Sequence, residues 1–267
     1  MSIHPTAIIH PDAQIADDAQ IGAYVCIEGP AVINAGCTIN AHAILTGTVR
    51  LGTNNTVGYG AVIGAAPQAL SFHPEIRSEV VIGDNNTLRE YCTIHRGMKE
   101  GGVTRIGDHN FLMAGTHLGH DCQIGNHVII ANNVLLGGHV EIRDRAFIGG
   151  GAVFHQFVRV GELVVAQGNS AFSKDIPPYL IAAEHNYVFG LNVVGLRRAG
   201  LSAETRQEIK DAFKLLFKTG LNTRQALEES KKRSWSEHSR IFFEFVESAK
   251  KRGICFLPHQ DREQVEE

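Results

Sequence analysis

The sequence lacks the long apolar runs and the strong net charge that mark membrane-spanning and nucleic-acid-binding chains. No stretch of eighteen apolar residues occurs, so we expect no membrane span. The first residues, MSIHPTAIIHPDAQ, have neither a basic region nor an apolar core, which argues against a signal peptide. The formal net charge of −3 gives no overall attraction to nucleic acid or to an anionic membrane. These absences predict a cytoplasmic protein that binds no nucleic acid.

Paired cysteines and common cofactor motifs are also missing. The five cysteines are odd in number, scattered and without CxxC spacing, which predicts reduced thiols. No P-loop, GxSxG or HExxH motif is present, so the familiar phosphate-binding, serine-hydrolase and metalloprotease arrangements are excluded. We therefore expect no cofactor and no resident metal.

What the sequence has instead is a period of six. A period of six fits neither an α-helix nor an amphipathic strand, but it is typical of a parallel β-helix in which three hexads complete one coil. Each inward residue then stacks on the residue eighteen positions away, with coils about 4.8 Å apart. The first apolar series is Ile3, Ile9, Ile15, Ile21, Ile27, Ile33, Ile39, Leu45, Leu51, Val57 and Ile63. The last is Ile106, Leu112, Leu118, Ile124, Ile130, Leu136, Ile142, Ile148, Phe154, Val160, Ala166 and Phe172.

Two interruptions and a change of composition divide the chain. Polar stretches near residues 64–81 and 95–105 break the period, which predicts two exposed loops. After Phe172 the hexads stop, and apolar residues recur at helical spacing from Ile209 onward. We predict a β-helix over residues 1–173, a linker over 174–200 and a helical domain over 201–267.

The predicted fold class is an all-β left-handed parallel β-helix with a small α-helical C-terminal domain. The left-handed sense comes from the known hexapeptide class and not from the period. A solenoid of this length has flat sides that can pack together. Trimers are the usual solution in the hexapeptide class, so we expect a homotrimer with active sites in grooves between subunits.

The spacing rule gathers polar residues onto one edge of the coil. Adding eighteen to His120 gives Gly138, and adding eighteen to Asp121 gives His139; one further coil reaches His155 and Gln156. A carboxylate beside an imidazole can orient it as a general base, and a glycine N–H can approach a developing oxyanion. The sequence therefore predicts an acid–base site with catalytic residues His120, Asp121 and Gly138.

Two other interpretations of this edge remain open. In the first, the histidines and aspartate only satisfy neighbouring backbone groups in a ladder of turns. In the second, His117, His120 and His139 bind zinc, as three histidines do in γ-class carbonic anhydrases of this fold.

Six segments carry a resemblance to a known family. They closely resemble the UDP-N-acetylglucosamine acyltransferases, which catalyse the first step of lipid A biosynthesis, and the likeness covers nearly the whole chain. The segments are IHRG (residues 94–97), HLGHD (117–121), GGHV (137–140), IGGGAVFHQF (148–157), DIPPY (175–179) and GLNVVGLRRAG (190–200).

The resemblance implies a role for each matching residue. It implies that His120 deprotonates the glucosamine 3-hydroxyl, that Asp121 orients His120 and that the Gly138 N–H binds the oxyanion. Gly168 falls where the family sets acyl-chain length, and a glycine there is similar to the long-chain members. The substrate-binding candidates are Gln68, His117, His139, His155, Gln156, Gly168, Asn192 and Arg198.

The implied donor is a 3-hydroxyacyl group on acyl carrier protein, which is an acidic partner. Lys210, Lys214 and Lys218 recur at helical spacing and form either a basic face for this carrier or a merely solvated helix face.

Two departures from the family pattern concern the acceptor. Ala69 and Ser71 follow Gln68 where the family commonly has an aspartate and a lysine, and Ala199 stands where the family has the second arginine of a pair. They leave open a paralogous acyltransferase for another nucleotide sugar, such as a 3-amino analogue.

Overall fold

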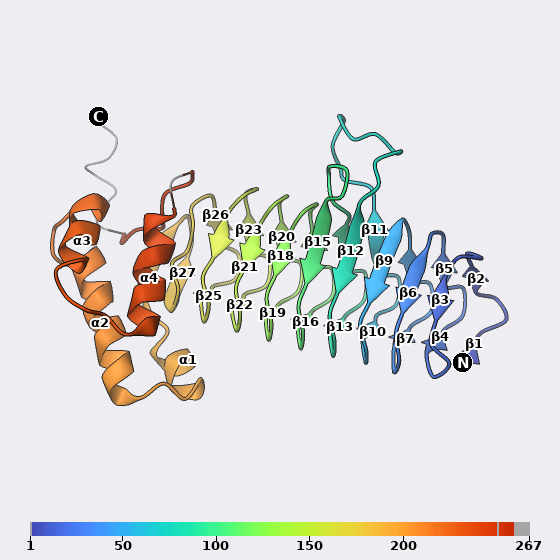
Figure 1. Ribbon diagram of the computed structural model, residues 1–267, viewed down its shortest axis with the longest axis horizontal. Helices are drawn as coiled ribbons and strands as arrows, with labels where there is room; N and C mark the ends of the chain where they lie inside the picture. The colour runs from blue at the N-terminus through green and yellow to red at the C-terminus, as the bar shows by residue number, and fades with distance from the viewer. Residues whose placement is uncertain (1, 250, 259–267) are drawn as a thin grey trace.

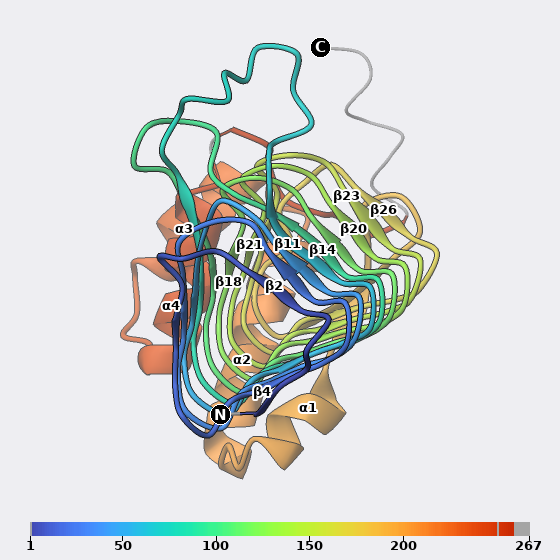
Figure 2. The same ribbon diagram turned by 90° about the vertical axis from the view of Figure 1, so that its right-hand side faces the viewer.

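The computed structural model describes residues 2–249 and 251–258, and most of them form a triangular parallel β-helix (Figures 1 and 2). Each coil adds one strand to each of three sheets, here named A, B and C. Sheet A contains β1 (Ser2–Ile3), β4 (Gln20–Ile21), β7 (Thr38–Ile39), β10 (Thr56–Val57), β13 (Thr87–Leu88), β16 (Phe111–Leu112), β19 (Ile129–Ile130), β22 (Phe147–Ile148), β25 (Val165–Ala166), β27 (Leu180–Ala183) and β28 (Tyr187–Leu191). Sheet B contains β2 (Ile8–Ile9), β5 (Cys26–Ile27), β8 (Ile44–Leu45), β11 (Val62–Ala65), β14 (Thr93–His95), β17 (His117–Leu118), β20 (Leu135–Leu136), β23 (Val153–Phe154) and β26 (Ala171–Phe172). Sheet C contains β3 (Gln14–Ile15), β6 (Ala31–Ile33), β9 (Thr48–Leu51), β12 (Glu79–Ile82), β15 (Val103–Ile106), β18 (Gln123–Ile124), β21 (Glu141–Ile142) and β24 (Arg159–Val160).

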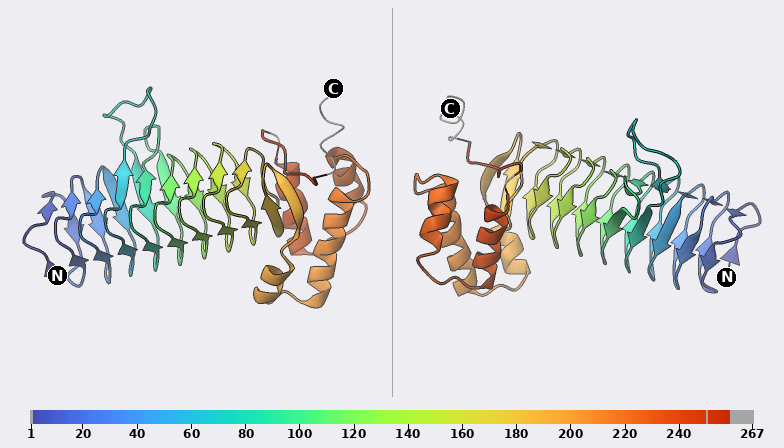
Figure 3. Two further views of the ribbon diagram at one scale, coloured as in Figure 1. Left: turned by 180° about the vertical axis from the view of Figure 1, so that it is seen from behind. Right: turned by 45° about the horizontal axis from the view of Figure 1, so that its top comes forward.

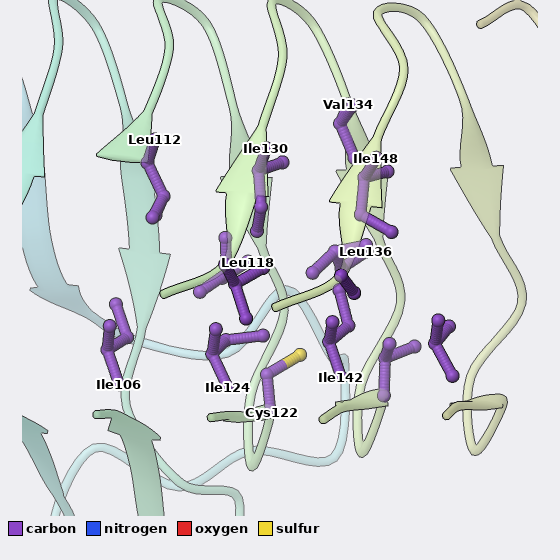
Figure 4. Close-up of a cluster of buried hydrophobic side chains, with 14 of the residues drawn as sticks. Ile106, Leu112, Leu118, Cys122, Ile124, Ile130, Val134, Leu136, Ile142 and Ile148 are labelled. Atoms are coloured by element: carbon purple, nitrogen blue, oxygen red, sulfur yellow. The ribbon is translucent and has the colours of Figure 1, made fainter. Parts of the chain in front are cut away.

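The hexad period corresponds to the register of these sheets. In β4 and β7, Ile21 lies opposite Ile39, and in β19 and β22, Ile130 lies opposite Ile148, eighteen residues on in both cases. Figure 4 shows the resulting rows of inward side chains between Ile106 and Ile148. From Ile21 onward the apolar residues of both series are at most 3% exposed. Burying each Leu or Ile of this kind stabilises the fold by about 1.5–3 kcal/mol.

The turns between sheets form three corners, named AB, BC and CA after the sheets that they join. At the BC corner Asp121, His139 and Phe157 all have left-handed backbone, with φ of 60°, 60° and 68°. The backbone also links one coil to the next here, because the N–H of His139 donates to the carbonyl of His120 at 2.9 Å. Side chains at successive coils of a corner therefore leave the backbone in the same direction.

Both loops leave the coil at the BC corner (Figures 1 and 2). The loop expected near residues 64–81 spans 66–78 between β11 and β12, so Val57 pairs with Leu88, 31 positions on. The loop expected near 95–105 spans 96–102 between β14 and β15, so Ile94 pairs with Leu118, 24 positions on. The loops lengthen two coils, and the parallel pairing continues past them with one register shift, between Ile63 and Ala65 in the β11–β14 pair.

Segment 174–200 differs from the linker that we predicted. It contains β27, which extends sheet A by pairing with β25, and β28, which pairs antiparallel with β27. It also contains the helix α1 (Val193–Arg198). The hexad pattern misses these elements because β27 pairs with β25 at a spacing of sixteen residues and not eighteen, and because β28 runs antiparallel.

Three further helices follow α1 at the C-terminal end of the coil (Figure 3). They are α2 (Ala203–Phe217), α3 (Thr223–Ser230) and α4 (Glu237–Glu247). The apolar face of α2, from Ile209 to Phe217, is buried against its neighbours. Residues 259–267 of the predicted helical domain lie outside the described residues, and none of the described helices has the length and apolarity needed to cross a bilayer.

Candidate active site

The BC corner brings together the residues that the spacing rule selected. His120 and Asp121 lie on one coil, Gly138 and His139 on the next, and His155 and Gln156 on the one after. His155 and Gln156 are exposed, whereas the His120 and Asp121 side chains are 19% and 15% exposed. The centre of the group is therefore half-buried, and its C-terminal side is open to a ligand.

His120 and Asp121 form a hydrogen-bonded pair. Nδ1 of His120 lies 2.8 Å from Oδ2 of Asp121, so with an ionised carboxylate Nδ1 carries the proton and donates it. The same oxygen accepts a hydrogen bond from the Met98 N–H at 2.9 Å, and the Asp121 N–H donates to Oγ1 of Thr104 at 2.8 Å. Asp121 is thus held from the second loop and from β15, and it leaves Nε2 of His120 as a free acceptor.

Gly138 lies directly against that free nitrogen. A Cβ atom built at position 138 would be 2.5 Å from Nε2 of His120, so a side chain there would displace the imidazole. The Gly138 N–H donates to no acceptor among the described residues. A small backbone donor next to an imidazole nitrogen with no other partner among the described residues suits a reaction in which negative charge develops on an oxygen.

His139 packs across the pair. Its ring meets that of His120 edge-on, with centroids 5.0 Å apart, and stacks on Phe157 at 4.5 Å. Burial lowers the pKa of His139, and the positive charges of Lys99 and Lys251 lower it further, although Asp121 acts in the opposite direction. Its imidazole is therefore biased towards the neutral form beside His120.

A second pair of histidines, His95 in β14 and His117 in β17, lies next to His120 and His139. His117 bonds Oγ1 of Thr93 through Nδ1 at 2.8 Å, and its ring meets that of His95 edge-on at 4.9 Å. Burial and the neighbouring His117 and His120 lower the pKa of His95 from 6.5 to about 4, and burial lowers the pKa of His117. Both rings therefore stay neutral near pH 7 and add no charge beside the base.

The remaining candidates lie elsewhere in the chain. Gln68 is exposed in the 66–78 loop, which starts at the same corner, but Gly168 lies at the AB corner. Asn192 and Arg198 line a cavity of about 660 Å³ at the CA corner. Asn192 also caps α1, because its Oδ1 accepts from the Gly195 N–H at 2.8 Å. Within this chain the predicted substrate contacts therefore lie at different corners of the coil.

Sequence reasoning missed His95, Met98, Thr104 and Phe157. His95 and Met98 lie before and within the second loop, where pairing residues are 24 apart, so adding eighteen could not reach them. Thr104 lies after this loop in β15, which pairs with β18 at the ordinary spacing of eighteen, so it lay one residue from the position eighteen before Asp121. Phe157 was within reach, since it lies eighteen residues after His139. The spacing rule was applied only to polar residues. Phe157 is apolar, so nothing in the sequence marked it as a neighbour of His139.

A trio of potential metal ligands lies within the same group. Atoms of His120, Asp121 and His139 lie within 4.8 Å of one another, which is close enough for one divalent cation. In the structure Nδ1 of His120 and Oδ2 of Asp121 bond each other, which is the arrangement that an acid–base pair needs.

Comparison with known proteins adds independent information. A family model described as Udp N-acetylglucosamine O-acyltransferase, domain 2, matches residues 175–255, and the bacterial transferase hexapeptide model of six repeats matches residues 104–138. The acyl-[acyl-carrier-protein]–UDP-N-acetylglucosamine O-acyltransferase of Campylobacter concisus is 41% identical over 92% of this chain and 94% of its own length.

Solved structures agree in fold over almost the same length. The UDP-N-acetylglucosamine acyltransferase from Bacteroides fragilis is 41% identical with a TM-score of 0.90, covering 94% of this chain and 99% of that one. The Arabidopsis enzyme is 30% identical with a TM-score of 0.85, covering 95% of this chain and 99% of that one.

The low pKa of His95 makes folding sensitive to acid. Between pH 6.5 and about 4 the unfolded chain binds a proton at this residue that the folded chain does not, so the free energy of unfolding falls as the pH is lowered. We expect His95→Leu to weaken this pH dependence by up to one proton in urea unfolding followed from pH 7 to pH 4. The exposed His4→Leu should leave the slope unchanged, and equal slopes in both variants would contradict the assignment.

Proposed function

The chain belongs to the family of UDP-N-acetylglucosamine O-acyltransferases, and from this premise we propose how its BC corner performs the reaction. It is an acyltransferase that moves a 3-hydroxyacyl chain from acyl carrier protein to the 3-hydroxyl of UDP-N-acetylglucosamine, the first step of lipid A biosynthesis. The comparisons do not favour a zinc-dependent enzyme or an acyltransferase for another acceptor.

The proposed mechanism is general-base acyl transfer. Nε2 of His120 takes the proton of the 3-hydroxyl while that oxygen attacks the thioester carbonyl carbon. The Gly138 N–H donates to the oxyanion that forms, and Asp121 stabilises the charge on the imidazolium. When the intermediate collapses, the carbon–sulfur bond breaks and His120 returns the proton to the leaving thiolate. No cofactor takes part in these steps.

One observation carries this proposal. The His120–Asp121 hydrogen bond directs Nε2 towards Gly138, so the proton acceptor and the oxyanion donor are neighbours before any substrate binds. Such an arrangement needs little reorganisation during the reaction, which is the main source of electrostatic catalysis.

We expect the purified protein to acylate UDP-N-acetylglucosamine with a 3-hydroxyacyl carrier protein, as read by mass spectrometry of the sugar nucleotide. His120→Ala should lower kcat by about 10²- to 10⁴-fold, because it removes the base. His10→Ala is a matched control, since His10 also faces an aspartate, Asp12, at the BC corner but lies many coils away. If His120→Ala keeps most of its activity while circular dichroism is unchanged, the assignment is wrong.

A homotrimer would complete the site, and the outer faces of the three sheets support this proposal. Near the site the outward residues of sheet C are polar, namely Arg105, Gln123, Glu141 and Arg159, whereas most of those on the other two sheets are apolar. The apolar residues are Ile129, Phe147 and Val165 on sheet A and Leu135 and Val153 on sheet B. Two apolar sides on a three-sided prism suit a closed ring in which sheet A of one subunit packs on sheet B of the next.

This packing would unite the separated candidates. The BC corner of one subunit would lie beside the CA corner of its neighbour, and the two groups occupy the same coils along the axis. His120 and Gly138 would then face Asn192 and Arg198 of another copy, and Gly168 would lie towards the threefold axis.

Mixed trimers test the shared site. Neither His120→Ala nor Arg198→Glu should be active alone, but co-expression with two affinity tags gives trimers that contain both. Each mixed ring has one interface with an intact His120 and an intact Arg198, so we expect up to about one third of wild-type kcat. Mixed trimers as inactive as their parents would show that each subunit builds its site alone.

The carrier protein would dock on a basic cavity between α1 and α2. The cavity measures about 500 Å³, and every charged residue lining it is basic: Arg197, Arg206, Lys210, Lys214 and Lys218. A concave surface of one charge favours the docking role of the three lysines over a merely solvated face, because it matches an acidic partner.

Neutralising this cavity should weaken carrier binding selectively. We expect Lys210→Gln/Lys214→Gln to raise KM for the acyl carrier protein about tenfold at low salt and to leave KM for the sugar nucleotide unchanged. Lys231→Gln/Lys232→Gln changes the net charge equally at exposed ion pairs of α3 and should have little effect. An equal rise in both double variants would mean that only net charge matters.

Three further features complete the proposal. We propose that the β-helix winds left-handedly, as the hexapeptide class does. Residues 1–173 and 201–267 would be the two domains, joined by 174–200 through β27, β28 and α1. The enzyme would work in the cytoplasm, where both substrates are available.

A further inference from the structure

The CA-corner cavity contains a second arginine, Arg145, beside Arg198. The cavity is bounded by sheet A on one side and α1 on the other. Arg145 lines it from the corner turn before β22, and Arg198 lines it from the last turn of α1. His127 and Asn192 add polar atoms, and no acidic residue lines it. The site therefore attracts anions.

The Arg145 charge is not neutralised within the described part of the chain. Arg145 and Arg198 form no ion pair with any described residue. Other arginines near the end of the coil are engaged: Arg159 pairs with Asp175 at 2.7 Å, and Arg143 lies over the Phe245 ring at 5.2 Å. Arg145 is therefore an exposed guanidinium that lines the cavity and pairs with no acidic group among the described residues.

The backbone directs Arg145 into this position. Its φ of +58° is the left-handed turn conformation that His127 and Leu163 also adopt at this corner. Its N–H donates to the carbonyl of Asn126 on the preceding coil at 2.9 Å, so the turn is anchored. The guanidinium therefore starts from a rigid corner and not from a mobile loop.

The same cavity contains Ala199, where the resemblance places the second arginine of a pair. α1 thus contributes one guanidinium to the cavity, while the corner turn contributes another. A diphosphate has two charged groups, and a planar guanidinium can donate two parallel hydrogen bonds to each. One arginine would leave half of such a ligand without a cationic partner.

We propose that Arg145 binds the diphosphate of the nucleotide sugar together with Arg198, and so supplies the cation that position 199 lacks. Phe147, which is 40% exposed in the same cavity, offers an apolar ring against which the nucleobase packs. This inference rests on the proposed function, and it names the residue that holds the acceptor. The phosphate of the carrier's prosthetic group has the same chemistry, so the experiment separates the two sources.

The test compares Arg145→Met with Arg143→Met, an arginine two residues earlier that lies over Phe245 and not in the cavity. We expect Arg145→Met to raise KM for UDP-N-acetylglucosamine about 10- to 100-fold, the loss expected for a charge-assisted contact. KM for the acyl carrier protein should stay unchanged, and kcat should stay within about twofold. Arg143→Met should behave as wild type. Adding Ala199→Arg to Arg145→Met should return KM towards the wild-type value.

Three results would overturn the inference. They are an unchanged KM for the sugar nucleotide in Arg145→Met, a rise only in KM for the carrier protein, or equal effects of both single variants. Calorimetric titration with UDP keeps this test separate from the proposed function. If the wild type binds UDP and Arg145→Met binds it at least tenfold more weakly, the inference stands even where the acylation assay fails.

Discussion

The stacking of one coil on the next at a single strand spacing is the constraint on which the rest of this structure depends. Parallel strands in the three sheets keep residues eighteen apart in contact, so a side chain on one coil lies about 4.8 Å from its counterpart on the next. His120 can therefore lie against Gly138 although neither belongs to a flexible loop. The rigid coil supplies the preorganisation that an acid–base site needs.

The loops add what the regular coil cannot supply. Both interrupt the BC corner, and the second brings the Met98 N–H to the carboxylate of Asp121. Gly97 and Gly102 approach so closely that a Cβ on Gly97 would lie 2.3 Å from the Gly102 carbonyl carbon, so the loop is narrow at its base. A single inserted segment thus fixes the orientation of the Asp121 carboxylate, while the buried His95 and the half-buried His117 stay neutral beside it.

The three sheets differ in the polarity of their outer faces, and this difference links the site to the proposed trimer. Near the site the polar outer face of sheet C suits solvent, whereas the mainly apolar outer faces of sheets A and B suit contact with other copies. Under the proposed ring, the BC corner provides the chemistry and the CA corner of the neighbour provides the nucleotide contacts. This division also explains how the chain can lack an arginine at 199, because Arg145 on the corner turn can reach the same cavity from another direction.

The sequence by itself determined the coil, its period and the grouping of His120, Asp121, Gly138 and His139, because a residue eighteen positions on is always a spatial neighbour when every coil has the same length. It also identified the two loops at which the period is interrupted, but not the conformation of these loops. Only the tertiary structure decided that His95 approaches His117, that Met98 approaches Asp121, that segment 174–200 extends sheet A, and that Arg145 shares a cavity with α1. Those contacts depend on the conformation of the inserted loops and on the packing of the C-terminal segment against the coil. Neither follows from the six-residue period of the sequence.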